Sequence, residues 1–145
     1  MRSQRMLRNF TWKWLAGAFV FAGLMTTMAA CSDDDNQCVA GKACACTGDC
    51  SQTCGGSSGA GCTFDCPEGA TCTFSCPGGS CAAHGHDAKS VTVDCPGNSC
   101  TVDCTGTATD NCTVTSCTSA CALNCGGATT CSNSCDLTGA CTLSE

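Results

Sequence analysis

Cysteine is the residue type that most constrains how this chain can fold. It accounts for 21 of the 145 residues, and large apolar residues are scarce beside it. Beyond residue 30 the chain has no Trp, Tyr, Ile or Met, and ten sizeable apolar side chains remain: Val39, Phe64, Phe74, Val91, Val93, Val102, Val114, Leu123, Leu137 and Leu143. The burial of so few apolar side chains does not offset the conformational entropy that is lost when about a hundred residues become ordered. The sequence therefore predicts a body held together by cross-links.

Twenty of the cysteines lie beyond the first 37 residues, and complete pairing requires an even number. In an oxidising compartment we expect them to form disulfides. The candidates are Cys38, Cys44, Cys46, Cys50, Cys54, Cys62, Cys66, Cys72, Cys76, Cys81, Cys95, Cys100, Cys104, Cys112, Cys117, Cys121, Cys125, Cys131, Cys135 and Cys141. Their connectivity stays open, because twenty cysteines allow a very large number of pairings.

The first thirty residues are typical of a secretory signal. Four basic residues precede an apolar run over 14–24, and small residues follow it. The run is shorter than the roughly 20 residues that cross a bilayer, which favours a cleaved leader over a retained anchor. We therefore assign residues 1–30 to a signal peptide.

The end of this leader, Met28-Ala29-Ala30-Cys31, resembles the lipobox of bacterial lipoproteins. The resemblance implies cleavage between Ala30 and Cys31, a diacylglyceryl group on the Cys31 thiol, and an acyl chain such as palmitate on the new amine. It also implies an outer-membrane location, because Ser32 follows the lipidated position. Ordinary secretory cleavage after Ala29 is the alternative. Apart from this covalent lipid, we expect no cofactor.

The acidic segment that follows, 31–37, is predicted to be a flexible tether. The leader carries four of the six Lys and Arg and none of the twelve Asp and Glu, so the remainder has a formal charge of −10. This charge argues against nucleic acid as a partner. It also argues against an electrostatic attachment to anionic lipid, which leaves the lipid anchor as the expected link to the membrane.

A five-residue kernel, Cys-x-apolar-x-Cys, repeats along the body. The segments 59–67 and 69–77 align with a period of ten, and further kernels begin at Cys100 and Cys121. Val91 takes the first cysteine's place in one variant, and 112–117 has one extra residue, as a β-bulge would. The alternation predicts short strands, and the Gly- and Pro-rich spacers predict turns. We expect a small all-β fold, a short β-solenoid of stacked kernels; an irregular disulfide knot is the alternative.

Cysteines at the two ends of one kernel would be about 13 Å apart, too far for a disulfide, whereas stacked strands are about 4.8 Å apart. We therefore expect pairing between stacked kernels. Residues 38–58 lack apolar kernels and read as a cysteine-rich cap and Gly/Ser joint before the repeat body, 59–145. The cap contains five cysteines, so at least one of them should pair with the body.

Two polar groups are candidates for metal binding. His84, His86 and Asp87 could bind Zn or Cu weakly, although a solvated loop is favoured because no further ligand can be placed. Asp65, Asp94 and Asp103 share one outward slot of the kernel, where a column of carboxylates would suit Ca, although a soluble polar face explains them equally well.

Threonine fills the other outward slot, at Thr63, Thr73, Thr92, Thr101, Thr113 and Thr142. The triplet Thr71-Cys72-Thr73 resembles the Thr-Cys-Thr of insect ice-binding solenoids. The period here is ten residues rather than twelve, and ordinary β-propensity favours threonine on a strand.

No His-Glu-x-x-His, phosphate loop or Cys-x-x-Cys motif is present, so we expect no enzyme activity. The sequence favours an envelope lipoprotein with a structural or interaction role, whose protein or surface partner is open. The alternatives are a cysteine-rich binder of Zn, Cu or Ca, and a secreted, inhibitor-like disulfide knot.

Overall fold

The computed structural model describes residues 36–56, 59–106, 108–135 and 142–144. These residues form twelve strands and no helix, as the all-β prediction requires. In chain order the strands are β1 (Gln37–Val39), β2 (Ala43–Ala45), β3 (Cys50–Gly55), β4 (Thr63–Asp65), β5 (Thr71–Ser75), β6 (Ala82–His84), β7 (Ser90–Asp94), β8 (Thr101–Asp103), β9 (Asn111–Cys117), β10 (Ala122–Asn124), β11 (Thr130–Cys135) and β12 (Thr142–Ser144).

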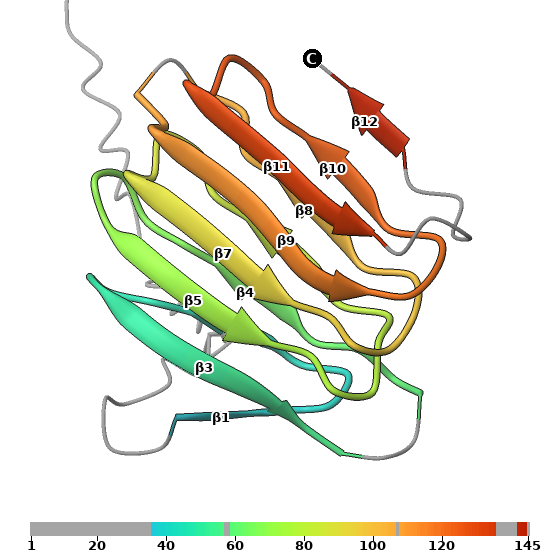
Figure 1. Ribbon diagram of the computed structural model, residues 1–145. Helices are drawn as coiled ribbons and strands as arrows, with labels where there is room; N and C mark the ends of the chain where they lie inside the picture. Colours follow the sequence, from blue (N-terminus) through green and yellow to red (C-terminus); the bar gives the residue numbers. More distant parts are fainter. Residues whose placement is uncertain (1–35, 57–58, 107, 136–141, 145) are drawn as a thin grey trace, which may run out of the picture.

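The strands form two six-stranded parallel sheets that face each other (Figure 1). One sheet, here called the odd sheet, has the order β1-β3-β5-β7-β9-β11, and the even sheet has the order β12-β10-β8-β6-β4-β2. From β3 to β11, paired residues of the odd sheet are 18 to 22 positions apart along the chain. The chain therefore winds as a flattened β-solenoid, and the predicted ordered stack is confirmed.

The ten-residue period of the sequence is half of a coil. The kernel that begins at Cys62 lies on the even sheet around β4, and the next, which begins at Cys72, lies on the odd sheet around β5. Consecutive kernels thus face each other across the core, and it is alternate kernels that stack. The expectation that each kernel stacks directly on the next was wrong on this point.

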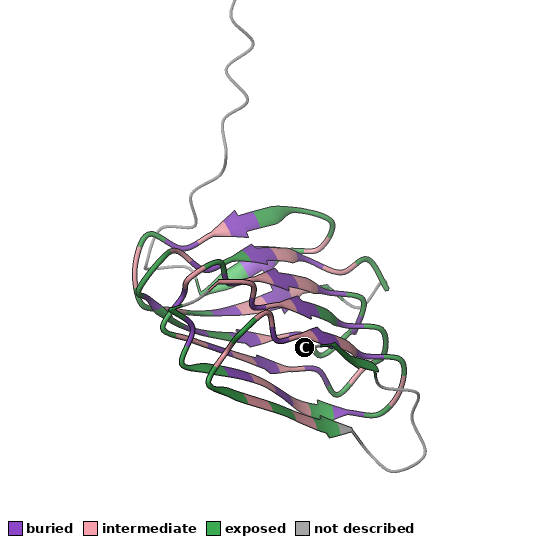
Figure 2. Ribbon diagram, turned by 90° about the horizontal axis from the view of Figure 1, so that it is seen from above, coloured by how far each residue is buried: buried purple, intermediate pink, exposed green. Residues whose placement is uncertain are grey.

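The core is a thin layer between the two sheets. Along β1 to β10, inward buried residues alternate with outward exposed or half-buried ones (Figure 2). Phe64 and Phe74 meet from opposite sheets with ring centroids 4.5 Å apart and planes within 7°. Above them the facing inward residues are smaller, Ala83 opposite Val93 and Val102 opposite Val114, all fully buried. The two buried phenylalanines thus share one layer of the stack.

Two of the ten apolar side chains stand outside this core. Val39 in β1 is 65% exposed and Leu143 in β12 is 53% exposed, and these two strands lie at opposite ends of the stack. Leu137 falls outside the described residues. Each exposed side chain belongs to an edge strand, which has a pairing neighbour on one side within the described part of the chain.

Nine disulfides cross-link the described residues, and each joins the end of one strand to the start of the next. Five lie at the edge where the chain passes from odd to even strands: Cys38–Cys44, Cys54–Cys62, Cys76–Cys81, Cys95–Cys100 and Cys117–Cys121. Four lie at the opposite edge: Cys46–Cys50, Cys66–Cys72, Cys104–Cys112 and Cys125–Cys131.

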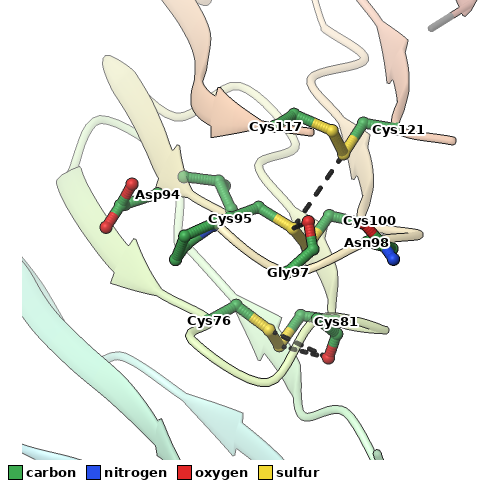
Figure 3. The surroundings of a disulfide bond; sticks show 12 residues. Cys76, Cys81, Asp94, Cys95, Gly97, Asn98, Cys100, Cys117 and Cys121 are labelled. Atoms are coloured by element: carbon green, nitrogen blue, oxygen red, sulfur yellow. Dashed lines mark hydrogen bonds between the residues drawn. A yellow bond between two sulfur atoms is a disulfide. The ribbon is translucent and has the colours of Figure 1, made fainter. Parts of the chain in front are cut away.

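Figure 3 shows three of these disulfides one above another at the first edge. The expected pairing between stacked strands was wrong, because each described disulfide closes the flattened coil at its narrow side. The Cα–Cα distances, 5.7 to 6.5 Å, lie within the range that disulfides require. Two candidates remain: Cys141 and the side chain of Cys135, which ends β11, both fall outside the described part of the structure.

Two smaller expectations are confirmed. The extra residue in 112–117 does produce a register shift between β9 and β11, next to Ser116 with its positive φ of 57°. Cys54, one of the five cysteines of the proposed cap, pairs with Cys62 in the repeat body, while the other four pair among themselves. Strands β1 to β3 continue both sheets in parallel register and form the first coil of the same stack.

Candidate functional site

The outer face of the odd sheet is covered with hydroxyl groups, and we call it the hydroxyl face. Its central column runs through Ser51, Thr73, Thr92, Thr113 and Ser132, one residue from each of five adjacent strands. The flanking columns add Thr53, Thr71, Ser75, Ser90, Asn111, Thr115 and Thr130, with Asp94 as the one ionisable residue among them. All are exposed or half-buried.

The predicted column of six threonines is divided between the two sheets. Thr73, Thr92 and Thr113 lie on the hydroxyl face. The other three, Thr63, Thr101 and Thr142, lie on the even sheet, where Ala82 and Ala122 separate them. The division follows directly from consecutive kernels lying on opposite sheets.

The outer face of the even sheet carries a different column, formed by Asp65, His84, Asp103, Asn124 and Ser144. The Asn124 side-chain amide donates a hydrogen bond to Asp103 Oδ1 at 3.2 Å. The continuous column of carboxylates expected for Ca is not formed, because His84 separates Asp65 from Asp103 and Asp94 belongs to the other sheet.

Asp94 has a local partner on the hydroxyl face. The Thr115 hydroxyl donates to its Oδ1 at 3.3 Å, from the neighbouring strand β9. This hydrogen bond gives the Asp94 carboxylate a partner within the protein, so its position does not require a bound ligand.

His84 and His86 lie side by side at the end of β6, with ring centroids 6.1 Å apart and planes within 9°. His86 Nδ1 lies 2.7 Å from the Thr105 hydroxyl oxygen on the adjacent turn. Asp87 is directed elsewhere: its backbone has a φ of 55°, and its Oδ1 accepts a hydrogen bond from the Ala108 backbone N–H at 3.3 Å. The structure therefore brings the two imidazoles together and ties Asp87 to the neighbouring turn.

Cysteine sulfurs form the three groups of potential metal ligands that lie within 4.8 Å of one another among the described residues. These are Cys46, Cys50 and Cys72; Cys54, Cys76 and Cys81; and Cys95, Cys100 and Cys121. Each member is joined in a disulfide. A metal takes cysteine as a thiolate, so these sulfurs are not ligands in the oxidised protein.

No family model, curated protein or solved structure matches this chain. The described part of the chain contains no helix of sufficient length and apolarity to span a bilayer. A hollow at the last coil is lined by Cys125, Gly127, Ala128, Thr129, Cys131 and Leu143, side chains that supply no general acid or base.

Proposed function

We propose that this protein is an exported lipoprotein, anchored by lipid on Cys31 in the outer membrane, whose body is a non-catalytic scaffold with a structural or interaction role in the envelope. The disulfides at both edges of the solenoid carry the proposal. Such cross-links form and persist outside the cytosol, and this body has few apolar side chains to replace them. Residues 1–30 are its signal peptide.

The anchor and the body fit each other in this proposal. Cleavage before Cys31 leaves a short acidic segment ahead of Gln37, where β1 begins. Two or more acyl chains hold a protein stably at a membrane, so the matured Cys31 needs no help from basic residues. The scaffold then stands next to the membrane surface, with the hydroxyl face and the even-sheet column available to a protein or surface partner.

Intact-mass analysis of protein from the envelope, with and without reduction, tests the proposal. We expect a mass that lacks residues 1–30 and includes the lipid, and thiol labelling close to zero before reduction. Protein found uncleaved in the cytosol with reduced cysteines would overturn the proposal. Many free thiols in the exported protein would instead favour a thiolate metal store.

A second arm tests the anchor separately. The Cys31→Ala variant should leave the membrane fraction and keep its disulfides, because none of the nine described disulfides uses Cys31. A wild-type protein released in soluble form would favour the secreted, inhibitor-like alternative. A Cys31→Ala variant that stays in the membrane fraction would contradict lipid anchoring.

A further inference from the structure

His84 and His86 present two imidazoles on one side of the even sheet. His84 ends β6, and His86 lies two residues later in the turn that follows the strand. Their rings are nearly parallel, with centroids 6.1 Å apart. Neutral imidazole is a preferred ligand of zinc and copper ions, and two adjacent rings form the start of a chelate.

Carboxylates from neighbouring coils flank this pair. The register pairs His84 with Asp65 of β4 on one side and with Asp103 of β8 on the other. Strands in a sheet are about 4.8 Å apart, which puts each carboxylate on the strand next to His84. No three of the donor atoms of His84, His86, Asp65 and Asp103 lie within 4.8 Å of one another as the side chains stand, so binding requires these side chains to turn toward a shared ion. Sequence proximity pointed to Asp87 as the third ligand, whereas the stacking of coils supplies Asp65 and Asp103.

Hydrogen bonds from neighbouring residues orient two of these side chains, those of His86 and Asp103. When His86 Nδ1 carries the proton, it donates to the Thr105 hydroxyl oxygen at 2.7 Å and leaves the Nε2 lone pair for an ion. Asn124 donates to one oxygen of Asp103 at 3.2 Å, which leaves the other oxygen free to bind. Metal-binding histidines and carboxylates characteristically have such outer partners.

Access and charge also suit a cation. His86 and Asp65 are exposed, and His84 and Asp103 are half-buried, so an ion reaches them without any opening of the fold. The chain carries a net charge of −6, which raises the local concentration of cations.

We infer that His84, His86 and Asp103 form a binding site for a divalent transition metal ion such as Zn²⁺ or Cu²⁺. Asp65 supplies a further negative charge beside the ion, and water fills the remaining positions. Asp87 is not a ligand. The site is independent of the lipid anchor, because all of its residues belong to the folded coils.

Calorimetric titration of the oxidised protein with Zn²⁺, in a buffer that does not chelate, tests this site. We expect one Zn²⁺ per chain, with affinity reduced at least tenfold by His84→Ala, by His86→Ala and by Asp103→Asn. A hundredfold excess of Ca²⁺ should not displace the zinc, because Ca²⁺ prefers oxygen ligands. Displacement by Ca²⁺, or absence of saturable zinc binding in the wild-type protein, would overturn the assignment.

Two variants serve as matched controls. Asp94→Asn removes the carboxylate from the same kernel slot on the opposite sheet, and Asp87→Asn keeps the side-chain oxygen that Ala108 requires. Both should bind Zn²⁺ with unchanged affinity. If Asp87→Asn weakened binding as much as Asp103→Asn, or if both histidine variants bound normally, the proposed ligand set would be wrong. Circular dichroism and disulfide mapping of each variant show whether it has folded.

Discussion

A β-carbon added to Gly85 would collide with the Cγ2 methyl of Val91, so these two residues fill each other's space at one edge of the solenoid. Backbone hydrogen bonds align Gly85 with Cys66 and Cys104 in the coils on either side. Val91 is aligned in the same way with Cys72 and Cys112. Gly85 and Val91 thus stand where each neighbouring coil has a disulfide. The Val91 methyl group fills the space that two sulfur atoms occupy in those coils.

Replacing both residues should complete this row of disulfides. In the Gly85→Cys, Val91→Cys double variant we expect a further disulfide at the edge that holds Cys66–Cys72 and Cys104–Cys112. It would stabilise the fold by roughly 2 kcal/mol in the chain-entropy model for a loop this short. Thiol labelling and urea unfolding of the oxidised protein measure both effects.

The single substitution Gly85→Ala is the companion to this variant. It should destabilise the protein by about 1–3 kcal/mol, because the methyl group overpacks against Val91. Gly48→Ala is its control, since a β-carbon at Gly48 meets nothing within 4 Å. Two free thiols in the double variant, or equal stability of the two alanine variants, would contradict the proposed equivalence.

Neighbouring disulfides are close enough to exchange. The sulfurs of Cys95 and Cys121 lie 3.9 Å apart, although each belongs to a different disulfide (Figure 3). Cys100→Ala should therefore leave a Cys95 thiol that attacks Cys121 as the thiolate, forms a Cys95–Cys121 bond and releases Cys117. Peptide mapping after alkylation without reduction should find Cys117 labelled.

Cys112→Ala is the control for this exchange. It frees Cys104, which lies outside the three clusters of sulfurs, so Cys104 itself should carry the label. Labelling confined to Cys95 in the Cys100→Ala variant would show that the stacked disulfides do not exchange.

The stacked phenylalanines are expected to contribute much of the apolar stability. Phe64→Ala should cost about 3–5 kcal/mol of unfolding free energy, because Ala83 in the next coil is too small to fill the resulting cavity. Leu143→Ala, at a side chain that is 53% exposed, should cost less than about 1 kcal/mol. Urea unfolding of the oxidised variants compares them, and similar losses would refute this account of the core.

The hydroxyl face is expected to leave ice growth unaffected. Its central column has three threonines and ends in Ser51 and Ser132, whose hydroxyls are less fixed because serine lacks the γ-methyl that restricts threonine. Asp94 also places a charged carboxylate among the hydroxyls. Microscopy of ice crystals growing in the protein solution measures the effect; faceted crystals or thermal hysteresis would contradict this expectation.

The alternation of buried and exposed residue types in the sequence predicted the strands well, and it predicted their arrangement less well. The alternation of Cys, Thr, Phe and Ser in 72–76 reports which side chains are buried, and β5 forms there. It does not report whether the next kernel stacks beside the first or turns to face it, since both arrangements bury the same residues. The disulfide pattern depends on that choice, so the pairing of Cys76 with Cys81 was inaccessible without the fold.

The candidate metal site was likewise only partly predictable from the sequence. The pairing of His84 with His86 was visible in the sequence, because only one residue separates them. Asp103 lies 19 residues beyond His84, and only the length of a coil places it beside that histidine. The coil lengths vary because the turns differ in length, so the register could not be counted from the kernels alone. Val91 was recognised as a variant of the kernel, but its complement Gly85 carries no pattern of its own.

The disulfides also determine how this molecule would respond to a pulling force. Each described cross-link joins strands that are consecutive in the chain, so successive coils adhere through hydrogen bonds and packing and not through these disulfides. Tension between a membrane-held N-terminus and a tethered C-terminal end would peel coils away one after another. The closed loops would keep the segments between bonded cysteines from extending. Such a chain would extend in small steps as coils detach. It would refold readily because the loops closed by disulfides stay intact, and this behaviour suits a link that must extend under load without rupture.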